Sequence, residues 1–244
     1  MTKTRGIKSV KRKIGDITKI VDSLLKDKKK IHILELGVGR GNALMALAKR
    51  YGKKVKLSGI NLKKGHGTDS RKDFITNALS FSVIKKGDLS KISLPYVYFC
   101  DAGKKIPLPS NSVDFMYSIT TFFFIPNKAH AIEELYRILK PDGIAAIHFK
   151  YFTKEFPRSY RNLFKIKQGK KEINVVEYLK KFKPSGIELR DIIKKGKKIK
   201  GVKVLVINKN KEKINLGLEF DKKQSINLLE IGNHYATRSV FNVK

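Results

Sequence analysis

Residues 33–41 read Ile33-Leu34-Glu35-Leu36-Gly37-Val38-Gly39-Arg40-Gly41, and this stretch decides the fold. An apolar run ends at the first glycine, and helix-forming residues begin at Asn42. The pattern predicts a buried strand, a tight turn and a helix. Alternating glycines let the backbone turn sharply and let a ligand approach where a Cβ would stand. Taken alone, the loop is equally compatible with a purely structural turn.

Strand and helix patterns alternate on both sides of this loop. We expect strands at 31–36, 55–60, 96–100, 113–118 and 144–149, and helices at 15–27, 42–50, 69–80 and 128–139. Further along, we expect a helix over 173–182 and a hairpin of strands 202–207 and 214–220. Alternation of this kind predicts an α/β fold with a mostly parallel sheet covered on both faces. Ligands of such sheets bind at the carboxyl ends of the strands.

The glycine loop discriminates between ligands. Its spacing is G-x-G-x-G, whereas a dinucleotide fingerprint requires G-x-G-x-x-G and would place its third glycine at Asn42. The Glu35 carboxylate would repel a pyrophosphate and attract an ammonium or sulfonium group. Lys63 and Lys64 keep an NADP-type alternative open, because a 2′-phosphate would pair with them.

Three ordered motifs carry a family resemblance across 31–149. They are 33–41 with the glycine loop, 99–103 (Phe-Cys-Asp-Ala-Gly) continued by 106–115, and 133–143 (Glu-Glu-Leu-Tyr-Arg-Ile-Leu-Lys-Pro-Asp-Gly). The chain here resembles the class I S-adenosylmethionine-dependent methyltransferases, most of all the broad subgroup that includes ubiquinone-biosynthesis-type enzymes. The resemblance implies a Rossmann-like fold with a seven-stranded, mostly parallel sheet, helices on both faces and an antiparallel last strand.

The resemblance also implies the cofactor, S-adenosylmethionine, and the residues that bind it. Glu35, Gly37, Gly39 and Gly41 would cradle its methionine part, Asp101 would accept a hydrogen bond from the adenine amino group, and the Ala102 amide would meet a ring nitrogen; Ser118 is also expected at the cofactor. The family's acidic ribose-binding position is Asn61 here, which departs from the pattern. An Asn can still accept from one hydroxyl and donate to another.

No specific catalytic base emerges from the sequence. The candidate acceptor loop, 118–124, lacks the Asn-Pro-Pro-Tyr-like motif of adenine-amino methylation and the nucleophilic cysteine of pyrimidine carbon-5 methylation. His148 and Lys150, at the end of the fifth strand, are candidates by position only. The five histidines and one cysteine have no metal-ligand spacing, so we expect no metal.

The formal net charge of +33 in 244 residues points to the acceptor. A basic arm over 1–13 and the lysine-rich segment 150–213, net +15, hold much of the excess, and 150–172 interleaves basic and aromatic residues. Such surfaces bind phosphates and stack bases, so we expect a polyanionic partner, RNA (ribosomal or transfer) first. Alternatives are a small-molecule or lipid acceptor, a non-catalytic binding module, and a codon bias toward lysine.

Composition limits the remaining possibilities. Hydrophobic residues make up 41% of the chain, which is enough for a core. We expect a basic arm and amphipathic helix at 1–30, a methyltransferase domain at 31–220 with 150–213 on the acceptor side, and a tail at 221–244. No membrane-length apolar run and no secretory signal are visible, so we expect an intracellular protein that is cytoplasmic or associated with the nucleoid or ribosome.

Overall fold

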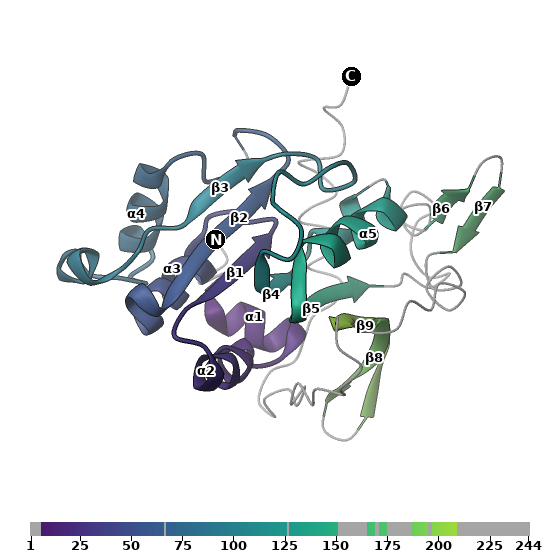
Figure 1. Cartoon of the computed structure of the whole chain (residues 1–244), viewed down its shortest axis with the longest axis horizontal. Coiled ribbons are helices and arrows are strands. Elements are labelled where there is room, and N and C mark those ends of the chain that lie inside the picture. Colours follow the sequence, from purple (N-terminus) through teal and green to yellow (C-terminus); the bar gives the residue numbers. More distant parts are fainter. Residues whose placement is uncertain are drawn as a thin grey trace.

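Parallel pairing of β1 (Ile31–Leu36) with β2 (Val55–Asn61) on one side and β4 (Val113–Ser118) on the other organises the computed structural model (Figure 1). The structure describes residues 6–65, 67–125, 127–150, 165–168, 171–174, 187–194 and 197–208. The main sheet has the order β3-β2-β1-β4-β5-β9-β8, in which β3 is Tyr96–Phe99 and β5 is Leu139–Lys150. Its first five strands are parallel, which confirms the expected α/β, Rossmann-like class.

Two strands extend the sheet beyond β5. β9 (Lys197–Asn208) runs antiparallel to β5, and β8 (Ile187–Lys194) runs antiparallel to β9. The expected hairpin of 202–207 with 214–220 is therefore wrong, because both edges of β9 are already paired; residues 214–220 lie outside the described residues. The helix expected over 173–182 is wrong at its start. A separate hairpin of β6 (Lys165–Gln168) and β7 (Lys171–Asn174) includes residues 173 and 174.

Helices cover both faces of the sheet. On one face pack α1 (Ile7–Ile14), α2 (Ile17–Asp27), α3 (Asn42–Tyr51) and α4 (Arg71–Ser80), whose apolar residues share one buried cluster. On the other face, α5 (Lys128–Ile138) and the loop between β3 and β4 form a second cluster. Arg137 of α5 fixes that loop, because its guanidinium donates to the carbonyls of Ile106 and Leu108, both at 2.9 Å. Arg137 thus ties the end of α5 to residues 106–108 of this loop.

The basic arm expected over 1–13 is replaced, from residue 7, by the packed helix α1. Val10 and Ile14 are 0% and 1% exposed and belong to the core beneath the sheet, whereas Lys8 is exposed. The spacing of Ile7, Val10 and Ile14 is helical. The prediction of an arm was wrong here because it was based on the many lysines and arginines and did not consider this apolar face.

A buried polar network joins the amino ends of the central strands. Asp114 of β4 is 0% exposed and accepts the backbone N–H of His32 at 2.8 Å, and its two oxygens pair with Lys28 and Lys140, each at 2.8 Å. Burial acts to raise the pKa of Asp114, but these donors together lower it. The His32 ring bonds the Ser112 carbonyl and the Ser58 hydroxyl, and burial lowers its pKa, so the ring stays neutral.

This network generates a stability prediction. Asp114→Asn leaves Lys28 and Lys140 without their carboxylate, so the free energy of unfolding, measured by urea denaturation, should fall by about 3 kcal/mol. Asp22→Asn is the control, because Asp22 meets Arg50 at an exposed site at 3.4 Å and should change stability far less. Equal losses in the two variants would contradict the importance assigned to the Asp114 network.

Candidate functional site

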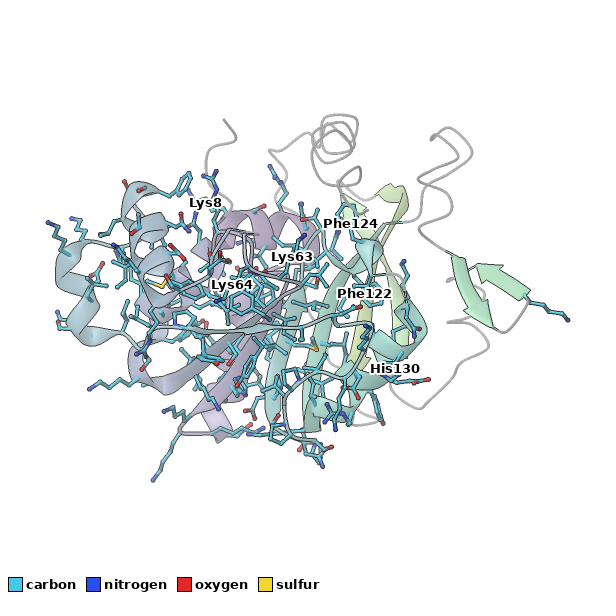
Figure 2. All side chains as sticks on the ribbon, turned by 90° about the horizontal axis from the view of Figure 1, so that it is seen from above. Lys8, Lys63, Lys64, Phe122, Phe124 and His130 are labelled. Atoms are coloured by element: carbon cyan, nitrogen blue, oxygen red, sulfur yellow. The ribbon has the colours of Figure 1, made fainter. Side chains whose placement is uncertain are left out.

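The predicted ligand residues gather where the central strands end. The glycine loop follows β1, residues 61–69 follow β2, residues 101–103 follow β3, and residues 119–125 follow β4. Strand order reverses between β1 and β4, and ligands of open parallel sheets bind at that point. In Figure 2, Lys63 and Lys64 lie near the middle of the molecule, with Phe122, Phe124 and His130 to one side of them.

Each glycine of the loop has a left-handed backbone, but the three occupy different surroundings. Gly37, at φ 83°, lies so close to Thr121 that an added Cβ would overlap its side chain, and a Cβ on Gly41, at φ 71°, would overlap Phe74. A Cβ on Gly39, at φ 53°, would meet nothing within 4 Å. The first and third glycines therefore permit packing within the protein. Gly39 faces open space, where a ligand could approach the backbone.

The loop after β2 folds onto the glycine loop. The Thr68 hydroxyl donates to the Gly39 carbonyl at 2.7 Å, and Asn61, which is 4% exposed, donates through Nδ2 to the Thr68 carbonyl at 3.4 Å. Asp69 accepts the Gly65 amide at 2.7 Å, which closes the turn. Asn61 is thus brought beside the glycine loop, as expected for a residue on the ribose side of the site.

Glu35 is buried next to this loop without a salt bridge. Its side chain is 3% exposed, it stands opposite Tyr117 in the β1–β4 register, and its Oε2 has no hydrogen-bond partner among the described residues. Burial raises the pKa of Glu35 to about 8, and the neighbouring Tyr117 hydroxyl opposes that rise. Burial likewise raises the pKa of Tyr117, with a further contribution from Glu35.

Three buried oxygen atoms around the loop lack partners among the described residues: Glu35 Oε2, Asn42 Oδ1 and Asp69 Oδ1. All three accept hydrogen bonds, so the group that satisfies them must bring donors or positive charge. S-adenosylmethionine offers an ammonium group and ribose hydroxyls, so its chemistry fits this donor-poor site. A pyrophosphate brings only acceptors and negative charge, which argues against the dinucleotide alternative.

The turn after β3 holds Asp101 and Ala102, whose contact with adenine stays a prediction. Asp101 accepts the Gly103 amide through Oδ1 at 2.8 Å, which holds its carboxylate in a fixed orientation. Ala102, between them, is 5% exposed. Cys100 precedes this turn; burial first, and then Asp101 and Glu134, raise the pKa of its thiol to about 11. The thiol is therefore no nucleophile, as the sequence indicated.

The other predicted site residues lie on β4 and β5. The Ser118 hydroxyl donates to the Leu36 carbonyl at 3.0 Å and so joins β4 to β1; its expected contact with the cofactor stays a prediction. His148 is 8% exposed, lies on β5 and pairs in register with Val204 of β9. Lys150 ends β5, and its side chain lies outside the described part of the structure. A catalytic role for either residue stays a prediction.

Two features of the segment between β4 and α5 could not be predicted from the sequence. Thr120 has φ 57°, which is a strained backbone for a β-branched residue. The next residue, Thr121, lies against Gly37 of the glycine loop. Lys128 is 2% exposed, and its ammonium donates to the Ile125 carbonyl at 2.7 Å; burial lowers its pKa to about 8. Neither has a sequence signal, because a lysine at a helix start normally faces solvent.

The aromatic run in this segment serves mainly the core. Phe122 is 0% exposed and Phe124 packs against the same apolar cluster, whereas the Phe123 side chain lies outside the described residues. Within the described ranges, no group of three His, Cys, Asp or Glu side chains could hold a metal ion. The same part of the chain contains no helix both long enough and apolar enough to cross a bilayer.

Comparisons with known proteins found one family model and several solved structures similar to this chain. Residues 34–147, just under half of the chain, match the family model described as a methyltransferase domain. A methyltransferase from Aquifex aeolicus, described as SAM-dependent, is 23% identical with a TM-score of 0.45, covering 76% of this chain and 87% of its own. One from Methanosarcina mazei is 16% identical with a TM-score of 0.48, covering 78% and 98%. The comparison with curated proteins finds no match.

The open space at Gly39 generates a binding prediction. Gly39→Ala and Gly65→Ala both place a side chain at positive φ with no neighbour within 4 Å, so each should cost about 1 kcal/mol of stability. Only Gly39→Ala should also weaken S-adenosylmethionine binding. The loss should be about tenfold or more, which is the scale of one lost close contact. Calorimetric titration measures this, and equal affinities in the two variants would remove Gly39 from the cradle.

The buried carboxyl generates a second prediction. In cofactor-free protein, folded Glu35 keeps its proton up to about pH 8, whereas the unfolded chain releases it near its ordinary value of 4.5, so this group lowers stability as pH rises between those values. Glu35→Gln should therefore unfold at a higher urea concentration than the wild type, and the gap should widen toward pH 8.

The control for this prediction is Glu134→Gln. Glu134 bonds Arg137 and the Ile106 amide, both at 2.7 Å, and the Arg137 guanidinium foremost lowers its pKa. Losing that carboxylate should reduce stability at neutral pH, the opposite sign from Glu35→Gln. If Glu35→Gln is instead the less stable protein across the pH range, Glu35 is ionised and paired in the folded state.

Proposed function

We propose that this chain is a class I S-adenosylmethionine-dependent methyltransferase and that its acceptor is RNA. The domain and the cofactor follow from the family match over 34–147 and from the motifs within it. The observation that carries the cofactor assignment in the structure is the unpartnered, buried Glu35 carboxyl beside an open glycine backbone. The identity of the acceptor is the further step that we propose.

The binding roles are assigned residue by residue. Glu35 holds the ammonium of the methionine part, Gly39 leaves its backbone open to that part, and Gly37 and Gly41 let the loop pack closely against Thr121 and Phe74. Asn61 accepts from a ribose hydroxyl through the oxygen left free by its bond to Thr68. Asp69 Oδ1, buried in the same loop, is available to a second hydroxyl and offsets the missing acid at position 61.

The adenine lies at the turn after β3 in this proposal. Asp101 Oδ1 is held by the Gly103 amide, which leaves Oδ2 to accept from the adenine amino group, and the Ala102 amide meets a ring nitrogen. The bound cofactor supplies an electrophilic methyl group on a sulfonium centre. The protein's task is then to orient the acceptor in line with that methyl and to exclude water. His148 and Lys150 remain the candidates for removing a proton from the acceptor.

Charge supports RNA as the acceptor. The segment 150–213, which follows β5 and carries net +15, is placed on the acceptor side of a catalytic domain spanning 31–220, with 221–244 as a tail. The α1 helix adds Lys8 and Lys11, both exposed, on the amino-terminal side. Lys63 and Lys64 add exposed positive charge beside the site, where phosphates of a polynucleotide would be neutralised. An RNA acceptor implies that the enzyme works inside the cell.

A small-molecule or lipid acceptor is the second candidate. It is favoured by the resemblance to the ubiquinone-biosynthesis-type subgroup and by the absence of a recognised RNA-binding motif in the sequence. A binding module without catalysis is disfavoured, because Glu35, Asp101 and all three loop glycines are present. The first two candidates differ in one measurable consequence of the lysine-rich composition: only an RNA acceptor predicts an RNA affinity that falls as salt rises.

A methyl-transfer assay decides between these acceptors. The protein is incubated with methyl-labelled S-adenosylmethionine and either total RNA or an RNA-free small-molecule and lipid extract from cells. We expect label in RNA, with RNA affinity falling steeply as salt rises, because phosphate contacts release counterions. Glu35→Gln and Gly39→Ala are the controls and should transfer little label. Label in the extract alone would replace RNA by a small acceptor.

A further inference from the structure

We propose that cofactor binding at Glu35 expels one proton from the site, and that Tyr117 is the positioning residue that stabilises the resulting carboxylate. This inference rests on the proposed function, because it concerns the same cofactor site. It assigns a role to Tyr117, which none of the family motifs includes. It also makes cofactor affinity depend on pH in a direction that the structure fixes.

The two side chains are held together by strand register. Glu35 and Tyr117 are directly opposite on parallel strands β1 and β4, so both side chains project from the same face of the sheet. Glu35 is 3% exposed and Tyr117 0%. Neither Glu35 Oε2 nor the Tyr117 hydroxyl has a partner in full hydrogen-bond geometry within the described residues, but the hydroxyl lies near enough to the carboxyl to lower its pKa. A buried carboxylate without a partner is costly, so the free protein holds Glu35 as a neutral acid.

Among the residues that the structure describes, no positively charged side chain pairs with this carboxyl. In the sheet register, Glu35 has Gly59 of β2 on its other side, and beyond Tyr117 comes Ala146 of β5. In the glycine loop, the Arg40 guanidinium lies 5.1 Å from the centre of the Phe81 ring. Tyr117 is the one titratable group among the described residues that acts on the Glu35 pKa, which burial raises to about 8.

Cofactor binding changes this balance through its ammonium group. As the ammonium approaches, the O–H bond of the Glu35 carboxyl breaks and its proton leaves to the buffer, while the ammonium keeps all of its hydrogens. Tyr117 loses no proton: its hydroxyl turns to donate to the new carboxylate, a charge-assisted hydrogen bond. Below about pH 8 the apparent dissociation constant should therefore fall about tenfold for each unit of rising pH, and above it should level off.

Calorimetry tests this proton balance directly. The full chain is titrated with S-adenosylhomocysteine, which keeps the ammonium but lacks the sulfonium charge, in two buffers of different ionisation enthalpy. The difference in heat gives the number of protons released. We expect about one proton released for each ligand bound at about pH 6.5, and a smaller release as the pH approaches about 8. At about pH 9.5 release should give way to uptake, because part of the free ligand's own amine is then neutral and must regain its proton to bind. Isolating the ammonium in this way ties the proton to Glu35 rather than to the transferable methyl group.

Variants assign the proton and the role of Tyr117. Glu35→Gln should bind more weakly and release no proton at either pH. Tyr117→Phe should still release a proton, but the pH at which affinity levels off should move upward, because the hydroxyl lowers the Glu35 pKa. Tyr51→Phe, which alters a hydroxyl bonded to Asp22 at 2.8 Å, is the control and should match the wild type.

The possible outcomes separate this inference from the proposed function. Tight binding by the wild type with no proton release at either pH overturns the inference and leaves the methyltransferase assignment standing. An unmoved pH profile in Tyr117→Phe overturns the role of Tyr117, because a residue that only packs would change affinity without moving the profile. No binding of S-adenosylhomocysteine or S-adenosylmethionine at any pH overturns both the function and the inference.

Discussion

The parallel pairing of β1 with β4 is the constraint on which the rest of the structure depends. At the amino ends, Asp114 of β4 accepts the His32 amide of β1, and at the carboxyl ends the Ser118 hydroxyl donates to the Leu36 carbonyl. These two bonds frame a register in which Glu35 faces Tyr117. A slip of one residue would move Glu35 to the opposite face of the sheet and away from the glycine loop's ligand side.

The same pairing separates stability from function along the sheet. At the amino ends each oxygen of Asp114 accepts from a lysine, and one also accepts from a backbone amide, so that end contributes to stability. At the carboxyl ends, three buried acceptors around the glycine loop have no partner among the described residues. Natural proteins leave such groups unsatisfied mainly where a ligand completes them. The contrast supports the proposed binding site without reference to any family.

Much of the fold could be predicted from local patterns. The short apolar runs gave the five parallel strands, and helix-forming stretches gave α3, α4 and α5, because each of these signals is confined to one element. The strand Ile187–Lys194 and the pairing of β9 were missed, since pairing between segments distant in the chain has no local signal. Helix α1 was missed because its lysines and arginines obscured the helical spacing of Ile7, Val10 and Ile14.

The candidate site was predictable to the extent that glycines and acids mark it. Glu35, the loop glycines, Asn61 and the Asp101 turn all lie at the strand ends where the motifs placed them. Tyr117, Thr68 and Thr121 were not predictable, since their importance comes from register and loop folding: Thr68 bonds Gly39, and Thr121 covers Gly37. Sequence spacing identified the residues that we propose bind the cofactor, and the three-dimensional packing identified the residues that hold them in place.

The central claim is that Glu35 and Asp101 together hold S-adenosylmethionine at the switch point of the sheet. A crystal structure of the chain with S-adenosylhomocysteine tests it most directly. The account predicts the ligand's ammonium within hydrogen-bond distance of the Glu35 carboxylate, its adenine amino group at Asp101, and its backbone contacts at Gly39. A ligand bound elsewhere, or one that leaves the Glu35 carboxyl unpartnered, would contradict the account.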